Sequence, residues 1–224
     1  MVYPSSVVMR RTGWLSRQPA WFRDRVLDLC ETRTYQVGEK LYGLDDRTGG
    51  MFGIVEGFVD VILGVGPFPP FLAFVGRPGW WVGEAAAMTN TNRRSEVHAR
   101  TPAQALYLSA ERMVTLTTDD PEAWRRFAQL SVDHMDNALL LAATLNHANL
   151  RERVLATLWR LSGPESQSDE MIELPCMQTE IAELAGLSRN SVGPIMRRLV
   201  DEGLIEMQRR RLRYRPMMVR KALE

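Results

Sequence analysis

The order of apolar and polar residues changes along this chain, and each pattern predicts a different kind of element. Near the start, apolar residues recur at helical spacing from Trp21 to Leu29, which predicts a short amphipathic helix. Between Tyr35 and Leu108, brief apolar runs such as "MFGIVEG" and "FVDVIL" are separated by glycines at short, irregular intervals. Short β-rich runs divided by turn residues are typical of antiparallel sheets. We therefore expect an antiparallel β-roll or barrel in this part of the chain.

Helical spacing returns near Asp119, where two acidic residues and Pro121 suit the start of a helix. From there, small or apolar residues and one histidine follow in steps of three and four: Phe127, Leu130, His134, Ala138, Leu141, Leu145 and Ala148. This spacing is typical of a coiled-coil seam, and a helix with its own apolar stripe must bury it. The stripe can meet the same stripe of a second copy, or it can pack on the chain's own β-roll. We favour the first arrangement, a homodimer held by this helix.

Residues 178–199, "QTEIAELAGLSRNSVGPIMRRL", predict two short helices joined by a turn at Gly186, with Ser188 as the N-cap of the second. The second helix exposes side chains that can bind base edges and phosphates in a DNA major groove: Arg189, Asn190, Ser191, Arg197 and Arg198. The following "DEGLIEMQRRRLRYRP" reads as helix end, strand, basic turn and strand, with Arg209, Arg210 and Arg211 at the turn. Together these elements predict a winged helix-turn-helix that binds double-stranded DNA.

Charge supports this interpretation, although the formal net charge of the 224 residues is only +1. Seven basic and no acidic residues lie between Arg209 and Lys221, whereas the first 150 residues are close to neutral. A basic end on a neutral body suggests a polyanionic partner, with a solvated tail as the alternative.

Cysteines, histidines and apolar runs argue against several other classes of protein. Cys30 and Cys176 lie far apart, so neither a disulfide framework nor an iron–sulfur cluster or other metal site is expected. Haem could use His98, His134 or His147, but we expect His134 to be a packed or hydrogen-bonded residue. The chain shows neither a signal peptide nor an 18-residue apolar run, which predicts a cytoplasmic protein that does not enter a membrane. No Walker loop, Gly-x-Ser-x-Gly or His-Glu-x-x-His motif is present, so we do not expect an enzyme.

Three motifs in the same order resemble those of the CRP/FNR family of dimeric bacterial transcription regulators. "MFGIVEGFVDV" is similar to the family's core hairpin around Gly57, "PGWWVGEAAAMTNTNRRSEV" to its phosphate-binding cassette, and "LAGLSRNSVGPIMRRLVDEGLI" to its DNA-reading unit. The resemblance implies an α+β chain with three parts. They are a cyclic-nucleotide-binding-like antiparallel β-roll sensor of the double-stranded β-helix type over residues 1–118, a dimerisation helix over 119–149 and a winged helix-turn-helix over 150–224. It also implies sequence-specific regulation of transcription, with RNA polymerase as a further partner.

The cassette keeps five residues at the family spacing: Gly83, Glu84, Ala85, Arg94 and Ser95. By resemblance, Arg94 would pair with a cyclic phosphate, Ser95 and the backbone near Ala85 would donate to it, and Glu84 would hold the ribose 2′-hydroxyl. Arg93 would face solvent, because adjacent residues of an extended segment face opposite ways. The alternative is a charged surface loop in which Arg94 bridges to Glu84 or to a neighbouring glutamate, Glu96.

Two departures from the family pattern limit what the resemblance implies. In the recognition helix this chain has Asn190 where an acidic residue is usual and Pro194 where a second arginine is usual, so we expect a bent or shifted helix and a different operator. In the dimer helix, Ala138 and Leu139 replace hydroxyl residues that contact adenine, so we expect weak or unselective binding of cAMP or cGMP, or none. Two other functions stay open, namely an effector-independent DNA-binding factor and a nucleotide-binding module that acts on a partner protein.

Overall fold

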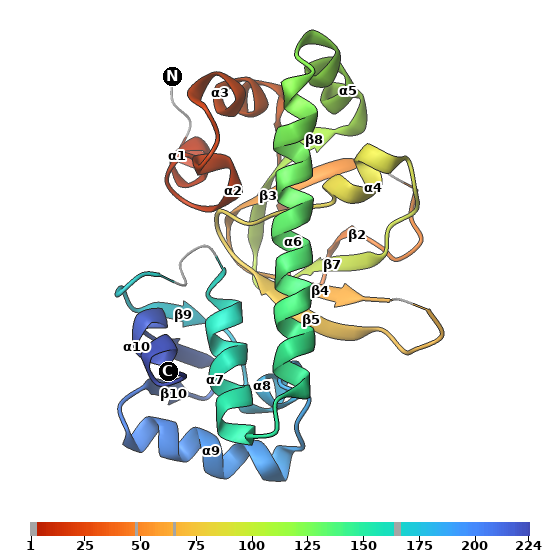
Figure 1. The fold of residues 1–224 in the computed structure, drawn as a ribbon. Helices are drawn as coiled ribbons and strands as arrows, with labels where there is room; N and C mark the ends of the chain where they lie inside the picture. The colour runs from red at the N-terminus through yellow and green to blue at the C-terminus, as the bar shows by residue number, and fades with distance from the viewer. Residues whose placement is uncertain (1–3, 48, 65, 164–166) are drawn as a thin grey trace. The chain divides into compact units, whose positions relative to one another are not determined.

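Two four-stranded antiparallel sheets form the centre of the first compact unit, Met1–His134 (Figure 1). The structure is a computed structural model that describes residues 4–47, 49–64, 66–163 and 167–224. One sheet has the order β1-β8-β3-β6, with β1 (Glu31–Tyr35), β8 (Ala103–Ser109), β3 (Gly50–Glu56) and β6 (Trp81–Val82). The other has the order β2-β7-β4-β5, with β2 (Lys40–Tyr42), β7 (Ser95–Ala99), β4 (Val59–Leu63) and β5 (Phe71–Gly76). The chain passes repeatedly from one sheet to the other, as a β-roll requires, and the predicted roll is confirmed.

Gly57 lies at the turn between β3 and β4, where the chain changes sheets. Its φ is +80°, and a Cβ atom there would come within 2.3 Å of the Pro102 carbonyl oxygen. Only glycine tolerates both the left-handed backbone and this close approach. The glycine in the motif "MFGIVEGFVDV" is therefore required by the path of the chain.

Helices complete the first unit and share one apolar core with the roll. They are α1 (Pro4–Arg11), α2 (Gly13–Ser16), α3 (Ala20–Leu29), α4 (Glu84–Thr89), α5 (Ala110–Asp119) and the first part of α6 (Glu122–Asn146). The α3 helix matches the amphipathic helix expected at Trp21–Leu29. The Trp14 ring packs against Trp81 and Phe127, with centroid distances of 5.7 and 6.0 Å, and the Trp14 indole donates to the Arg126 carbonyl at 3.0 Å. The start of α6 is therefore an integral part of this unit.

The second compact unit, Met135–Glu224, is a winged helix-turn-helix. After the end of α6 it contains α7 (Leu150–Leu161), β9 (Ile172–Leu174), α8 (Gln178–Leu184), α9 (Arg189–Asp201), β10 (Ile205–Gln208), β11 (Arg211–Tyr214) and α10 (Pro216–Lys221). The three strands form an antiparallel sheet in the order β10-β11-β9. Buried apolar residues from α7, α8, α9 and the sheet make its core: Val154, Leu158, Ile181, Leu184, Val192, Met196, Leu199 and Tyr214.

The apolar stripe predicted on α6 is only partly available for a second copy of the chain. Phe127 and Leu130 are 0% and 2% exposed in the core of the first unit, so for this half of the helix the alternative of packing on the chain's own roll is correct. The helix ends at Asn146, which leaves Ala148 outside it. The residues Phe127 and Leu130 therefore do not belong to a seam between two copies.

A different face of α6 carries large apolar side chains that are exposed: Trp124, Val132, Met135 and Leu139, at 41–60%. Steps of eight, three and four residues place them on one side of a helix, and Ala128 and Ala142 fall between and beyond them on the same side. We call these six residues the exposed α6 stripe. It differs from the stripe predicted from the sequence, because the first half of that predicted stripe packs into the core of the first unit.

Candidate functional site

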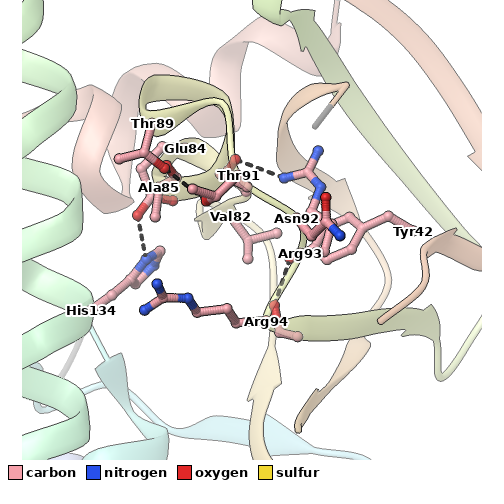
Figure 2. Close-up of a pocket in the computed structure, with 13 residues that line it drawn as sticks. Tyr42, Val82, Glu84, Ala85, Thr89, Thr91, Asn92, Arg93, Arg94 and His134 are labelled. Carbon is pink, nitrogen blue, oxygen red and sulfur yellow. Dashed lines mark hydrogen bonds and ion pairs between the residues drawn. The ribbon is translucent and has the colours of Figure 1, made fainter. Parts of the chain in front are cut away.

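Residues of the predicted cassette surround one pocket in the first unit, between α4, the start of β7 and α6 (Figure 2). Its volume is about 210 Å³. Thirteen residues line it: Tyr42, Val82, Gly83, Glu84, Ala85, Ala86, Thr89, Thr91, Asn92, Arg93, Arg94, Ser95 and His134. The structure therefore brings together all five residues assigned to a ligand by resemblance, from Gly83 to Ser95.

Gly83 sets the path of the chain into α4. Its φ is +101°, and a Cβ atom there would lie 2.5 Å from Nη1 of Arg93 and 2.9 Å from the Gly50 carbonyl oxygen. A larger residue would therefore strain the backbone and displace the arginine.

Arg93 does not face solvent, and the expectation that it does is wrong. Its side chain is 3% exposed, and its guanidinium donates to the carbonyl oxygens of Gly83, at 2.7 Å, and of Gly50. The same group lies over the Tyr42 ring, 4.3 Å from the centroid, and burial lowers its pKa. The alternation rule fails here because β7 begins only at Ser95, so Arg93 belongs to a loop whose backbone pairs with Asp45 and Asp46. Arg93 thus connects the cassette to strand β3 through its hydrogen bond to Gly50.

Arg94 is exposed and lines the pocket, and Figure 2 shows its side chain extending toward the side where His134 lies. Ser95 is half-buried, and its hydroxyl lies 3.1 Å from the Tyr42 hydroxyl. Burial raises the pKa of Tyr42 to about 12, so that hydroxyl keeps its proton near neutral pH. The pocket therefore offers an exposed cation and neutral hydroxyl groups, which suit the anionic part of a ligand.

Glu84, in contrast, is directed into the protein. It is 2% exposed, and its Oε1 accepts hydrogen bonds from the Ser131 hydroxyl at 3.0 Å and from Nδ1 of His134 at 3.1 Å. Burial alone would raise the pKa of Glu84, but the charge and hydrogen bond of His134, together with a backbone hydrogen bond and the Ser131 hydroxyl, outweigh burial and the pKa falls. Burial likewise opposes the charge on His134, but Glu84 raises the pKa of the imidazole above its ordinary value. The two side chains form an ion pair in which Glu84 is buried and the His134 side chain is 28% exposed.

The glutamates of the cassette therefore have partners other than those considered from the sequence. Glu96 pairs with Lys40 and, at 2.8 Å, with His98 on the surface of the second sheet. His134, expected to be packed or hydrogen-bonded, is both. The sequence analysis did not identify Ser131 and Tyr42 as pocket residues. Ser131 could have been found from its spacing, because it precedes His134 by three residues and such residues lie on the same face of a helix.

Exposed polar side chains cover the second predicted site, on α9. Arg189, Asn190, Arg197 and Arg198 are exposed, and Ser191 is half-buried. The predicted N-cap is present, because the Ser188 hydroxyl accepts from the Ser191 amide at 3.1 Å. The helix continues through Pro194 from Arg189 to Asp201, although proline cannot donate to the Asn190 carbonyl.

The hairpin β10–β11 supplies further exposed arginines. Gln208 pairs with Arg211, which leaves Arg209 and Arg210 as the two-residue turn at the tip. Arg211 contacts Glu173 at 3.6 Å, so a carboxylate competes for its charge. Arg209 and Arg210 are therefore the wing residues best placed to bind a phosphate backbone.

Comparisons with known proteins identify the two domains in which these residues lie. The family model of the cyclic nucleotide-binding domain matches residues 32–120, and that of the Crp-like helix-turn-helix domain matches residues 152–218. The chain is 26% identical over 191 residues to the CRP-like protein Clp of Xanthomonas campestris, covering 81% of this chain and 83% of that protein. It is 21% identical to the cAMP-activated global transcriptional regulator Vfr of Pseudomonas aeruginosa, covering 83% and 89%.

A solved structure of the c-di-GMP responsive global regulator CLP from Xanthomonas campestris has the same fold, with a TM-score of 0.63. It is 22% identical and covers 88% of this chain and 99% of that chain. Across the described parts of this chain, no helix is both long and apolar enough to cross a membrane. The same described ranges hold no cluster of three or more histidine, cysteine or acidic residues that could bind a metal ion.

Proposed function

We propose that this chain, which belongs to the CRP/FNR family of DNA-binding transcription regulators, works as a homodimer that reads a two-fold symmetric operator. The observation that carries this proposal is the arginine-rich surface made by α9 and the wing tip, on a folded helix-turn-helix. The function is one of binding and not of catalysis. We place it in the cytoplasm, where RNA polymerase is its further partner.

Dimer formation follows from the exposed α6 stripe and is typical of the family. A two-fold dimer presents two copies of α9 to one side of the duplex. Half-sites should then lie about 10–10.5 base pairs apart, centre to centre, because both helices must enter successive major grooves. Selection of bound sequences from random DNA tests this proposal, and sites without two-fold symmetry at that spacing would contradict it.

Two arginines should affect DNA binding in different ways. Arg189→Ala should weaken binding to the selected operator by roughly 1–3 kcal/mol and reduce the specificity at one base position, because Arg189 lies at the start of the recognition helix, α9. Arg210→Ala should weaken binding to all DNA sequences alike, because the wing tip binds phosphates. It should also lower the slope of log affinity against log salt concentration by about one. Titrations at several salt concentrations measure both effects. The control is Arg125→Ala, an exposed arginine of the first unit, which should change neither; an unchanged selected sequence for Arg189→Ala would refute its base-reading role.

A cyclic nucleotide is the effector class that the first domain supports. The anionic part of such a ligand fits the side chains of Arg94 and Ser95. The rest fits poorly: the pocket of about 210 Å³ is smaller than the roughly 300–1,000 Å³ of sites that enclose drug-sized ligands, and Glu84 is buried. Ala138 and Leu139 also cannot hydrogen-bond adenine. We therefore propose weak or unselective binding.

Calorimetry with cAMP, cGMP and c-di-GMP should give small binding heats for the wild type and none for Arg94→Leu, since Arg94 is the exposed cation of the pocket. The third nucleotide is included because one structural neighbour responds to it. Equal heats from both proteins would show that the binding does not use this pocket. Tight, adenine-selective binding would contradict the role given to Ala138 and Leu139.

A further inference from the structure

The carboxylate that a ribose 2′-hydroxyl would need is already bound within the protein. Glu84 is 2% exposed, and Ser131 and His134 of α6 both donate to the same oxygen, Oε1. Arg94, ten residues later and on the same pocket, is exposed. The two charged residues of the cassette therefore differ in their availability to a ligand.

We propose that His134 and Ser131 are positioning residues that hold Glu84 against α6, so that the pocket recognises the anionic group of its ligand and not a ribose hydroxyl. The proposal rests on the proposed function, because it concerns the ligand of the same pocket. His134 and Ser131 act through Glu84 and thereby determine which part of a ligand is read.

The balance of interactions favours the contact with α6 over a contact with ribose. Freeing Glu84 would leave the partly buried His134 imidazolium without its counter-charge, and breaking such a pair lowers an equilibrium constant by up to roughly a hundredfold. A single hydrogen bond from a hydroxyl to a carboxylate raises the affinity for a ligand by about tenfold. A ligand therefore gains less from Glu84 than the protein loses by releasing it.

Protonation of His134 should modulate this arrangement. The imidazole faces Glu84 of α4, neighbours Asp133 on its own helix, lies 5.6 Å from the Trp80 ring and shares the pocket with Arg93 and Arg94. Its pKa is raised, so the stabilising charge is fully present below the ordinary histidine value of 6.5 and is lost as the pH rises through the raised value. Glu84 should consequently become more available to a ligand at alkaline pH.

Calorimetry with cAMP and 2′-deoxy-cAMP tests the proposal. At pH 6.5 the wild type should bind the two within about threefold of each other, whereas a Ser131→Ala/His134→Ala double variant should prefer the ribose form by about tenfold or more. The wild-type preference should also rise between pH 6.5 and pH 9, and that rise should be absent in the double variant. His98→Gln is the matched control, because His98 also pairs with a glutamate but lies on β7 and is not one of the thirteen residues that line the pocket. A tenfold wild-type preference for the ribose form at pH 6.5 would overturn the proposal.

A second measurement needs no ligand and separates this proposal from the effector class. NMR titration should give His134 a pKa above that of a free histidine, and Glu84→Gln should lower the pKa of His134. If neither nucleotide binds, the cyclic-nucleotide effector is refuted while this titration still tests the Glu84–His134 contact. A His134 titration that Glu84→Gln does not move would overturn the proposal, even if both nucleotides bind.

Discussion

Leu139→Glu should convert the dimer into a monomer and reduce its affinity for operator DNA by about a thousandfold or more. Leu139 is 60% exposed, more than any other large apolar side chain of the exposed α6 stripe. In a symmetric pair of helices, the substitution places two carboxylates where neither is easily solvated. A monomer contacts only one half-site, so most of the advantage of specific over non-specific binding is lost. Sedimentation gives the oligomeric state, and a mobility shift gives the affinity.

Gln129→Glu is the matched control, because it adds the same charge to an exposed position on another face of the helix. It should leave the protein dimeric. Leu141→Glu distinguishes the exposed stripe from the stripe first predicted from the sequence, since Leu141 is half-buried on the latter face. If Leu139→Glu stays dimeric at micromolar concentration while Leu141→Glu dissociates, the sequence-based seam is correct for the second half of α6.

The two adjacent arginines of the cassette should give opposite results when each is replaced by methionine. Arg93→Met should lower the free energy of unfolding of the first unit by about 2–4 kcal/mol, because two buried carbonyl oxygens lose their donor. That is a large part of the roughly 5–15 kcal/mol that stabilises a typical domain. Urea unfolding followed by tryptophan fluorescence measures this, since five of the six tryptophans lie in the first unit.

Arg94→Met is the control, and it should change stability by less than about 0.5 kcal/mol, as exposed substitutions usually do. It should nevertheless abolish whatever anion binding the pocket shows. Equal losses of stability from both variants would mean that the buried contacts of Arg93 contribute little. Such a result would also remove the reason for regarding Arg93 as structural.

Local pattern was enough to predict several elements of this fold, namely α3, the β-rich region, α6 and the winged helix-turn-helix. Ser188 caps α9 as expected, because an N-cap depends on an amide only three residues away. The winged helix was predictable for the same reason, since its helices, turn and hairpin follow one another directly in the sequence. Gly57 was indicated by the family resemblance, and the contact that requires it is with the distant Pro102 carbonyl.

Long-range contacts explain what the sequence did not reveal about the pocket. The direction of Arg93 depends on the carbonyl of Gly50, 43 residues earlier, and the state of Glu84 depends on His134, 50 residues later. Likewise, the face of α6 that is left free for a second copy depends on which face the Trp14 and Phe127 cluster has already covered. Periodicity identifies an apolar stripe, but it does not say which surface covers it.

Because α6 runs without interruption from the first unit into the second, it limits where recombination can join the first domain of one regulator to the DNA-binding domain of another. The match to the cyclic nucleotide-binding domain ends at residue 120, yet Phe127 and Leu130 beyond it fill the core of the first unit. A recombination breakpoint at residue 120 would give this core a foreign helix. Breakpoints after His134, where the first unit ends, keep the core intact and still exchange the entire DNA-reading part. New pairings of sensor and operator should therefore arise by crossovers in the second half of this helix.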